Sequence, residues 1–331
     1  MGKSIRVLLG GLAAAAMMTS AAQADDKIII GTFGDPVPVQ MAAHDGLLKE
    51  ATGWDIDWRK FAAGTDVIAA MASGDVKLAE LGSSPFAIGA TQGVDMVAFM
   101  VDYIIGTSES LIVRDGAGIA DLADLKGKRV ATPLGSTAHF SLMGALKHAG
   151  VGENDVTIMG MSPDQITAAW QQEAIDAAFV WPPAQTEILK TGTRLVGADQ
   201  VAAWGYPTFN VWVVNKEFAA ENKEALVAFM KAVDAANAAY LKDPGAWTPD
   251  SPQIMSIADQ TGADPMAVPV TLEGYTFLPL KEQLDPLWMG GGIAKAVKDT
   301  AAFLKSAGRI DSVSDDYSDA VSVEYLQEAV Q

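Results

Sequence analysis

Two short loops in this chain carry hydroxyl side chains directly before a stretch with helical character. Ser83 and Ser84 follow one predicted strand, and Ser136 and Thr137 follow another. The first backbone N–H groups of a helix have no partner inside the helix, so hydroxyls placed there complete a set of neutral donors for an anion. Ser and Thr are also ordinary helix caps, but two matching loops in successive units favour an anion-binding site.

A third loop and one aromatic residue could complete such a site. The segment Gly31–Asp35 follows the first predicted strand and ends in the carboxylate of Asp35. Trp181 follows the apolar run 177–180 and precedes two prolines, which places it at the carboxyl end of a strand. A Trp in an apolar pattern is more often a core residue, so a packing role and a ligand-contacting role for Trp181 both stay open.

The residue types that carry catalysis are sparse. The chain has no Cys and three His, which are His44, His139 and His148. It contains no GxSxG, HExxH, Walker or GxGxxG motif. Ser136 and His139 are three residues apart at one predicted helix start, which is not the arrangement of a catalytic Ser–His pair. We therefore predict that the protein is not an enzyme and that it needs no cofactor and no metal.

The elements that must position these loops alternate between strand and helix. This alternation predicts mostly parallel sheets flanked by helices, with ligands bound at the carboxyl ends of strands. The pattern restarts near Ser110, and the chain from 217 to 306 is mainly helical. The predicted strands are 27–31, 54–61, 78–81, 110–113, 128–132, 156–159, 177–180 and 212–214, and the predicted helices are 39–52, 65–73, 119–125, 139–148, 162–172 and 182–191.

The second α/β unit interrupts the first along the chain. We predict that lobe I comprises residues 25–109 and 212–331, and that lobe II comprises residues 110–211. The chain would then cross between the lobes twice, near 108–111 and near 210–214, and these crossings would form a two-strand hinge.

The N-terminus predicts export. Lys3 and Arg6 precede the apolar run 7–18, and a small-x-small cleavage pattern ends at Ala24. The apolar run is shorter than the roughly 20 residues that a membrane-spanning helix needs. Because the chain also lacks a Cys that could accept lipid, we predict a cleaved signal peptide at 1–24 and a protein free in the periplasm.

The charge of the chain limits its partners. The formal net charge is -18, and loss of the two cations in the leader makes it about -20. Such a surface repels nucleic acid and anionic lipid, so we expect neither as a partner. An anionic ligand would have to be held by local donors against this field.

Several segments together resemble a known family. They are similar to the periplasmic taurine-binding proteins of ABC importers, within the nitrate, sulfonate and taurine group, and the likeness runs from about Lys27 to Tyr317. The segments that carry the resemblance are Asp57–Phe61, Ala72–Val76, Leu81–Pro85, Ala138–Leu142, Ala168–Gln171, Phe179–Pro182 and Val211–Val214.

The resemblance implies a type II periplasmic-binding fold that closes on a ligand between two α/β lobes. A permease and an ATPase of an ABC transporter would be its partners, and the receptor itself would be a monomer. A small sulfonate would meet hydroxyl and backbone donors, and an amine would meet a carboxylate and an aromatic wall. The ligand-binding residues implied are Ser83, Ser84, Ser136, Thr137 and His139 for the sulfonate, and Glu109 and Trp181 for the amine.

Two positions depart from the family pattern. Asn210 stands where the family usually has Asp, and Val37 stands where it usually has Glu. Both changes remove negative charge near the expected amine, and Asp35 could compensate. Taurine therefore competes with another alkanesulfonate or a substituted amino-sulfonate as the ligand. An enzyme on the same fold and a second role beside a chemosensory receptor are further alternatives.

Overall fold

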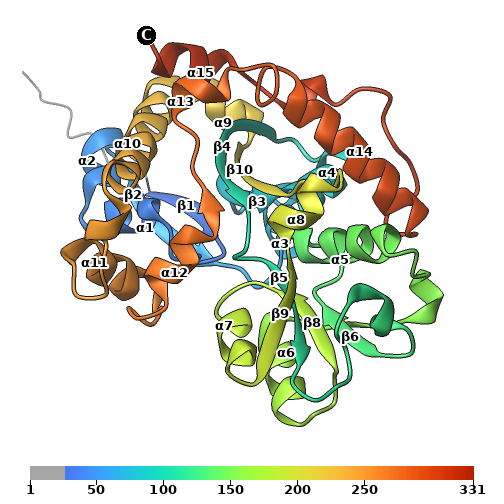
Figure 1. Ribbon diagram of the computed structural model, residues 1–331. Helices are drawn as coiled ribbons and strands as arrows, with labels where there is room; N and C mark the ends of the chain where they lie inside the picture. Colours follow the sequence, from blue (N-terminus) through green and yellow to red (C-terminus); the bar gives the residue numbers. More distant parts are fainter. Residues whose placement is uncertain (1–26) are drawn as a thin grey trace, which may run out of the picture.

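The computed structural model describes residues 27–331, which form two lobes with one β-sheet each (Figure 1). The predicted signal peptide, 1–24, lies outside these residues. The strands of the first sheet are β1 (Lys27–Thr32), β2 (Asp55–Lys60), β3 (Leu78–Gly82), β4 (Val97–Ile105), β10 (Phe209–Val214) and β11 (Tyr275–Thr276). The strands of the second sheet are β5 (Ser110–Arg114), β6 (Arg129–Thr132), β7 (Thr157–Gly160), β8 (Ala177–Val180) and β9 (Gly192–Gly197).

Helices flank both sheets. In Figure 1 the lower lobe contains only the middle of the chain, whereas the upper lobe combines segments from both ends. The helices that follow strands of the first sheet are α1 (Pro38–His44), α2 (Leu47–Thr52), α3 (Gly64–Ala72), α4 (Ser83–Thr91), α9 (Lys216–Glu221), α10 (Lys223–Lys242), α11 (Pro252–Thr261), α12 (Val268–Glu273), α13 (Leu280–Gln283), α14 (Gly292–Ser306) and α15 (Glu324–Ala329). Those that follow strands of the second sheet are α5 (Thr137–His148), α6 (Pro163–Gln171), α7 (Ala184–Ile188) and α8 (Ala198–Ala203).

The predicted two-lobed α/β class is confirmed, but the sheets are mixed rather than mostly parallel. The strand orders are β11-β4-β10-β3-β1-β2 and β7-β6-β8-β5-β9. β1 runs parallel to β2 and β3, and β6 runs parallel to β7 and β8. β10 and β5 run antiparallel to their neighbours because each receives the chain from the other lobe and leads away from the junction.

This arrangement brings opposite strand ends together at the junction. Asn210, at the start of β10, pairs with Gly82 at the end of β3. Ser110, which opens β5, pairs with Val180 at the end of β8. The loops after β3, β6 and β8 therefore meet the crossing segments at one place, as ligand sites in open α/β sheets do.

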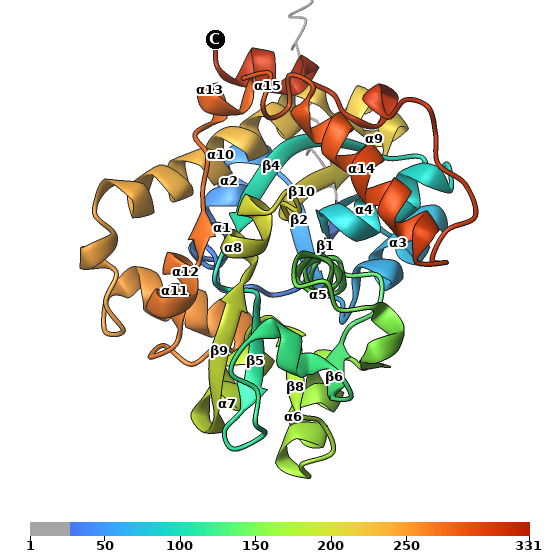
Figure 2. The ribbon, with the colours of Figure 1, turned by 45° about the vertical axis from the view of Figure 1, so that its right-hand side comes forward.

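The chain passes between the sheets at 106–109 and at 198–208. The two passages are hydrogen-bonded to each other at both ends, by Ile105 N to Thr208 O at 3.0 Å and by Ala198 N to Glu109 O at 2.9 Å. Both views of the ribbon place α5 and α8 where the lobes meet (Figure 2). Any movement of one lobe against the other would therefore bend these two paired segments together.

Three strands of the structure, β4, β9 and the two-residue β11, have no counterpart among the predicted strands. β4 is mainly apolar and is buried on both faces, so it lacks the alternation that marks a half-buried strand. β9 is an edge strand with exposed and buried residues in no regular order. The predicted helix 39–52 is instead two helices, because Gly46 adopts a left-handed conformation, with φ of 75°, between α1 and α2.

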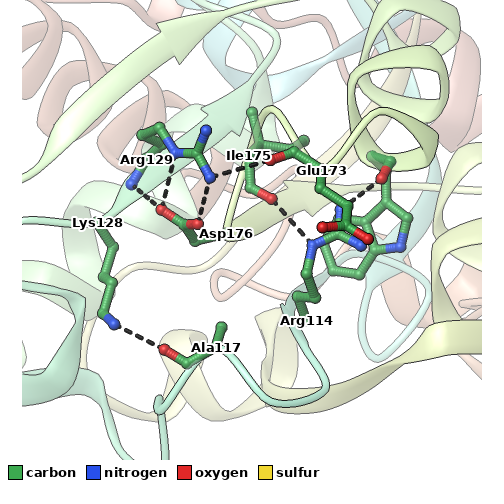
Figure 3. A network of polar contacts seen from close by, with 8 residues as sticks. Arg114, Ala117, Lys128, Arg129, Glu173, Ile175 and Asp176 are labelled. Atoms are coloured by element: carbon green, nitrogen blue, oxygen red, sulfur yellow. Dashed lines mark hydrogen bonds and ion pairs between the residues drawn. The ribbon is translucent and has the colours of Figure 1, made fainter.

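Arginine side chains tie the outer part of lobe II together (Figure 3). Arg129 pairs with Asp176 at 2.6 Å, which joins the start of β6 to the residue before β8. Arg114 donates from Nε to Ile175 O at 3.2 Å and from Nη2 to Trp170 O at 2.5 Å. Its guanidinium also lies 4.3 Å from the centre of the Trp170 ring. These contacts fix the end of α6 against the sheet.

Candidate functional site

A small cavity lies at the junction, where the strand ends and both passages converge. Its volume is about 40 Å³. One water needs roughly 10–15 Å³ on this measure, so the space suits a molecule of few heavy atoms. A wider groove of about 540 Å³ adjoins it, and Phe33 and Trp181 line both. Six residues singled out from the sequence line the cavity: Asp35, Glu109, Ser136, Thr137, Trp181 and Asn210.

One pole of the cavity is formed by two helix N-termini. α4 begins directly after Gly82, and α5 begins at Thr137. The two starts touch, since a Cβ on Gly82 would lie 3.0 Å from Thr137 Cγ2. Ser136 caps α5 by accepting a hydrogen bond from His139 N at 3.2 Å. The free N–H groups and dipoles of both helices therefore favour a negatively charged group here.

The donors at this pole are neutral. Among the described residues that line the cavity there is no Lys, Arg or His. An anion bound there would be held by backbone N–H groups and hydroxyls alone, which matches a weakly basic anion with several acceptor oxygens.

The other pole is acidic, and Glu109 is its centre. Thr137 Oγ1 donates to Glu109 Oε1 at 2.5 Å, while Glu109 Oε2 has no hydrogen-bond partner although it is buried. Burial raises the pKa of Glu109 to about 8, against the lowering effect of the Thr137 hydrogen bond. Because Thr137 opens α5 and also binds Glu109, the two poles are close together.

A second carboxyl, Asp35, faces the same cavity from the loop after β1. Tyr103 OH donates to Asp35 Oδ2 at 2.6 Å, and Asn210 Nδ2 donates to the Tyr103 oxygen at 2.6 Å. Burial raises the pKa of Asp35, whereas Tyr103 and Lys60 lower it. Because the amide nitrogen of Asn210 donates to Tyr103, its Oδ1 faces Gly82. A Cβ added to Gly82 would lie 3.3 Å from this oxygen.

Two more carboxyls lie behind the cavity. Glu80 accepts from Thr32 Oγ1 at 3.1 Å and from Phe33 N at 3.2 Å. Burial raises its pKa well above the ordinary value, and the charges of Asp102 and Asp35 add to this effect. Burial likewise raises the pKa of Asp102 to about 7. We call Asp35, Glu80, Asp102 and Glu109 the carboxyl cluster.

Three residues expected at the ligand do not line the cavity. Ser83 and Ser84 are fully buried in the first turn of α4, and their hydroxyls have no partner. His139 turns away, and its ring centre lies 6.4 Å from that of Phe303 in α14. Its Nδ1 accepts from Gly135 N at 3.3 Å, so the side chain holds the turn that leads into α5.

Other lining residues were not predicted as ligand contacts, although Phe33, Gly82 and Pro85 belong to loops named from the sequence. They come mainly from β4, β11 and the first turns of α3 and α4. The apolar run of β4 offered one signal, because Asp102 and Tyr103 interrupt an otherwise apolar stretch. The additional lining residues are Phe33, Gly64, Gly82, Pro85, Tyr103, Ile105 and Tyr275.

Residues 27–331 contain neither a candidate membrane-spanning helix nor a candidate metal cluster. No helix in this part of the chain is long and apolar enough to cross a membrane. No three or more His, Asp or Glu side chains in the same range are grouped so that they could hold a metal ion.

The chain is similar to a known family of proteins over most of its length. Residues 35–246 match the family model described as NMT1/THI5 like. The chain is 38% identical to the taurine-binding periplasmic protein of Escherichia coli (strain K12) over 316 residues, which is 96% of this chain and 97% of that protein.

Solved structures share the fold. The alkanesulfonate-binding protein SsuA from Xanthomonas axonopodis pv. citri, bound to MOPS, superposes with a TM-score of 0.72 at 21% identity and covers 89% of this chain and 98% of its own. The desulfurization enzyme DSZB superposes with a TM-score of 0.67 at 15% identity, over 92% and 99% of the two chains. The fold is therefore found in both binding proteins and enzymes.

Proposed function

This chain belongs to the NMT1/THI5-like family, and we propose that it is the solute-binding component of an ABC importer that captures taurine or a closely related small sulfonate. The similarity to a taurine-binding periplasmic protein over nearly the full length supports this proposal. The structure supports it independently through the chemistry of the cavity.

The observation that carries the proposal is the pairing of two opposite poles in one small cavity. Helix N-termini with neutral donors suit a sulfonate, and buried carboxyls suit an ammonium group. Thr137 belongs to both poles, because it opens α5 and donates to Glu109 at 2.5 Å. The distance between the charges of the ligand must then be short, as it is in a two-carbon amino-sulfonate.

Two carboxyl groups still line this cavity although Asn210 and Val37 replace the acids that the family usually has at these positions. Asp35 and Glu109 line it, while Val37 is buried and does not line it. We assign Glu109 and Asp35 to the ammonium, with Trp181 as an aromatic wall. Ser136, Thr137 and the first N–H groups of α4 and α5 are assigned to the sulfonate.

A substituted amino-sulfonate is the second candidate. The adjoining groove opens past Phe33 and Trp181 and offers about 540 Å³ of further space. A ligand with a bulky group on its amine could place that group there, with its sulfonate still at the two helix starts.

Several further assignments follow from the same proposal. The protein acts by binding and release without chemistry, in the periplasm, after removal of residues 1–24. It works as a monomer with a permease and an ATPase, and nucleic acid is not a partner. Residues 25–109 and 212–331 would act as lobe I, and residues 110–211 as lobe II.

Calorimetric titration of the protein without residues 1–24 tests the function. Taurine, hypotaurine, isethionate, ethanesulfonate, sulfoacetate and nitrate would be compared at one pH. We expect at least one sulfonate to bind with a micromolar or lower Kd, corresponding to about -8 kcal/mol or better. Binding no tighter than about millimolar for every sulfonate would refute the proposal.

A further inference from the structure

The four side chains of the carboxyl cluster are buried too deeply and too close together for all of them to be ionised at once. Asp35, Glu80, Asp102 and Glu109 are 7%, 0%, 2% and 4% exposed, respectively. The charge of Asp35 raises the pKa of each of the other three, so the members oppose one another's ionisation. Buried like charges that cannot all be solvated share protons.

Hydrogen bonding in the cluster is uneven. Glu80 receives two donors and Asp35 receives the Tyr103 hydroxyl. Glu109 and Asp102 differ from these two, because each has a buried carboxyl oxygen without a donor. In Glu109, Oε1 accepts from Thr137 and Oε2 has no partner, and in Asp102 it is Oδ2 that has none. A buried carboxylate oxygen without a donor is costly when charged, whereas the protonated form avoids that cost. Glu109 is the member of this pair that lines the cavity.

We propose that the site takes up the cationic group of its ligand in exchange for a proton from the carboxyl cluster, so that only sulfonates with a cationic group release a proton when they bind. This inference rests on the proposed function. In the exchange the O–H bond of Glu109 breaks, the proton leaves to the buffer, and the carboxylate pairs with the ammonium. The ammonium keeps its own protons.

The other groups that face Glu109 are compatible with this exchange. Asp35 approaches from the loop after β1, Tyr103 from β4 and Tyr275 from β11, and all three line the same cavity. Burial raises the pKa of both tyrosines well above the ordinary value, so they stay protonated. Burial raises the pKa of Asp35 as well, but the Tyr103 hydrogen bond and the charge of Lys60 oppose that rise. Glu109, whose Oε2 has no donor, is therefore the member of the cluster that we assign as the proton donor. Its pKa of about 8 means that it is mainly protonated in the free site at neutral pH.

Proton release can be counted by titrating the wild-type protein at pH 7.0 in two buffers with different ionisation enthalpies, phosphate and Tris. With taurine we expect the apparent enthalpy to depend on the buffer and to report release of close to one proton. Ethanesulfonate, which has no amine, should show no release. The Kd for taurine should also rise by up to about tenfold for each pH unit below pH 7.

Two variants locate the proton. Glu109→Gln should abolish the release while ethanesulfonate still binds, and Glu217→Gln, at an exposed position of α9, should leave the release unchanged. If taurine binds tightly with an enthalpy that is the same in both buffers, or if ethanesulfonate releases as much as taurine, the exchange is refuted and the transport function stands. If no sulfonate binds at all, the proposed function itself fails.

Discussion

His139 shows how a buried side chain can serve a ligand site without lining it. Its Nδ1 accepts from Gly135 N, which assigns the ring proton to Nε2, and that nitrogen has no partner. Burial lowers the pKa of His139 to about 4, and Arg309 adds to the effect, so the ring stays neutral at physiological pH. Gly135 has a φ of 80°, and the His139 acceptor holds this turn in place before the start of α5.

We predict that His139→Leu weakens sulfonate binding more than His139→Asn does. Leu leaves Gly135 N without its acceptor, at a cost of about 1–3 kcal/mol, whereas the Asn carbonyl lies near the position of Nδ1 and can replace it. Both substitutions remove ring contacts with Phe303, so thermal unfolding should detect a loss of stability in each. Calorimetric Kd values separate the two effects. Equal Kd values for both variants would rule out a positioning role.

At the scale of elements, the first passage between the lobes is packed against the chain around β11. Gly106 N donates to Gly274 O at 2.9 Å, and Ser108 Oγ donates to Thr271 O at 2.6 Å. A Cβ on Gly274 would lie 2.0 Å from Ser108 Oγ and 2.5 Å from Ser108 N. The hydroxyl could rotate away, but the backbone nitrogen could not. Glycine is therefore required where the passage to Glu109 meets the C-terminal helices.

Gly274→Ala should lower the free energy of unfolding by about 1–3 kcal/mol, because the added methyl group forces the two backbones apart. It should also weaken ligand binding, since the displaced passage carries Glu109. Chemical denaturation and calorimetry measure the two effects. Gly245→Ala is the matched control, as its Cβ would meet only Asp243 Oδ1 at 3.6 Å. A Gly274→Ala protein as stable as this control would contradict the packing argument.

For the whole molecule, the carboxyl cluster couples protonation to stability. It is buried where the two lobes meet, inside a chain whose net charge is already -18. Burial raises the pKa of Glu109 to about 8 and of Asp102 to about 7, while an unfolded chain has carboxyl pKa values near 4. The folded protein then holds protons that the unfolded chain has lost, so stability must fall as pH rises through this range.

We expect the free energy of unfolding of the ligand-free protein to decrease by about 2–3 kcal/mol between pH 6.5 and pH 9. The range starts at pH 6.5 because His139 acts in the opposite direction below that pH. Its pKa is lowered in the folded protein, so the unfolded chain takes up a proton first and stability falls as the pH is lowered. Denaturation at several pH values gives the slope, and Glu109→Gln should reduce it whereas Glu217→Gln should not. A stability that is constant or rises across this range would contradict the raised pKa values.

Much of the site was predictable because it depends on local rules. Ser136 and Thr137 could be predicted because a helix start directly after a strand is recognisable from neighbouring residues alone. The two lobes could be predicted because the strand–helix pattern restarts along the chain. The mainly apolar stretch of β4 follows no such rule, because a strand buried on both faces has no alternation to detect, and the interruption by Asp102 and Tyr103 was its one signal. Tyr103 and Asp102, which β4 supplies, were therefore missed.

The sequence by itself determined the α/β class, the family resemblance, the loops that carry donors and the acid at Glu109. Only the tertiary structure decided that Asp35, Tyr103 and Asn210 form one hydrogen-bonded chain, that His139 faces α14, and that four carboxyls share one buried volume. The reason is physical. Hydroxyls and helix starts act through neighbours in the chain, whereas the ionisation of a buried acid depends on charges brought to it by strands far apart in sequence.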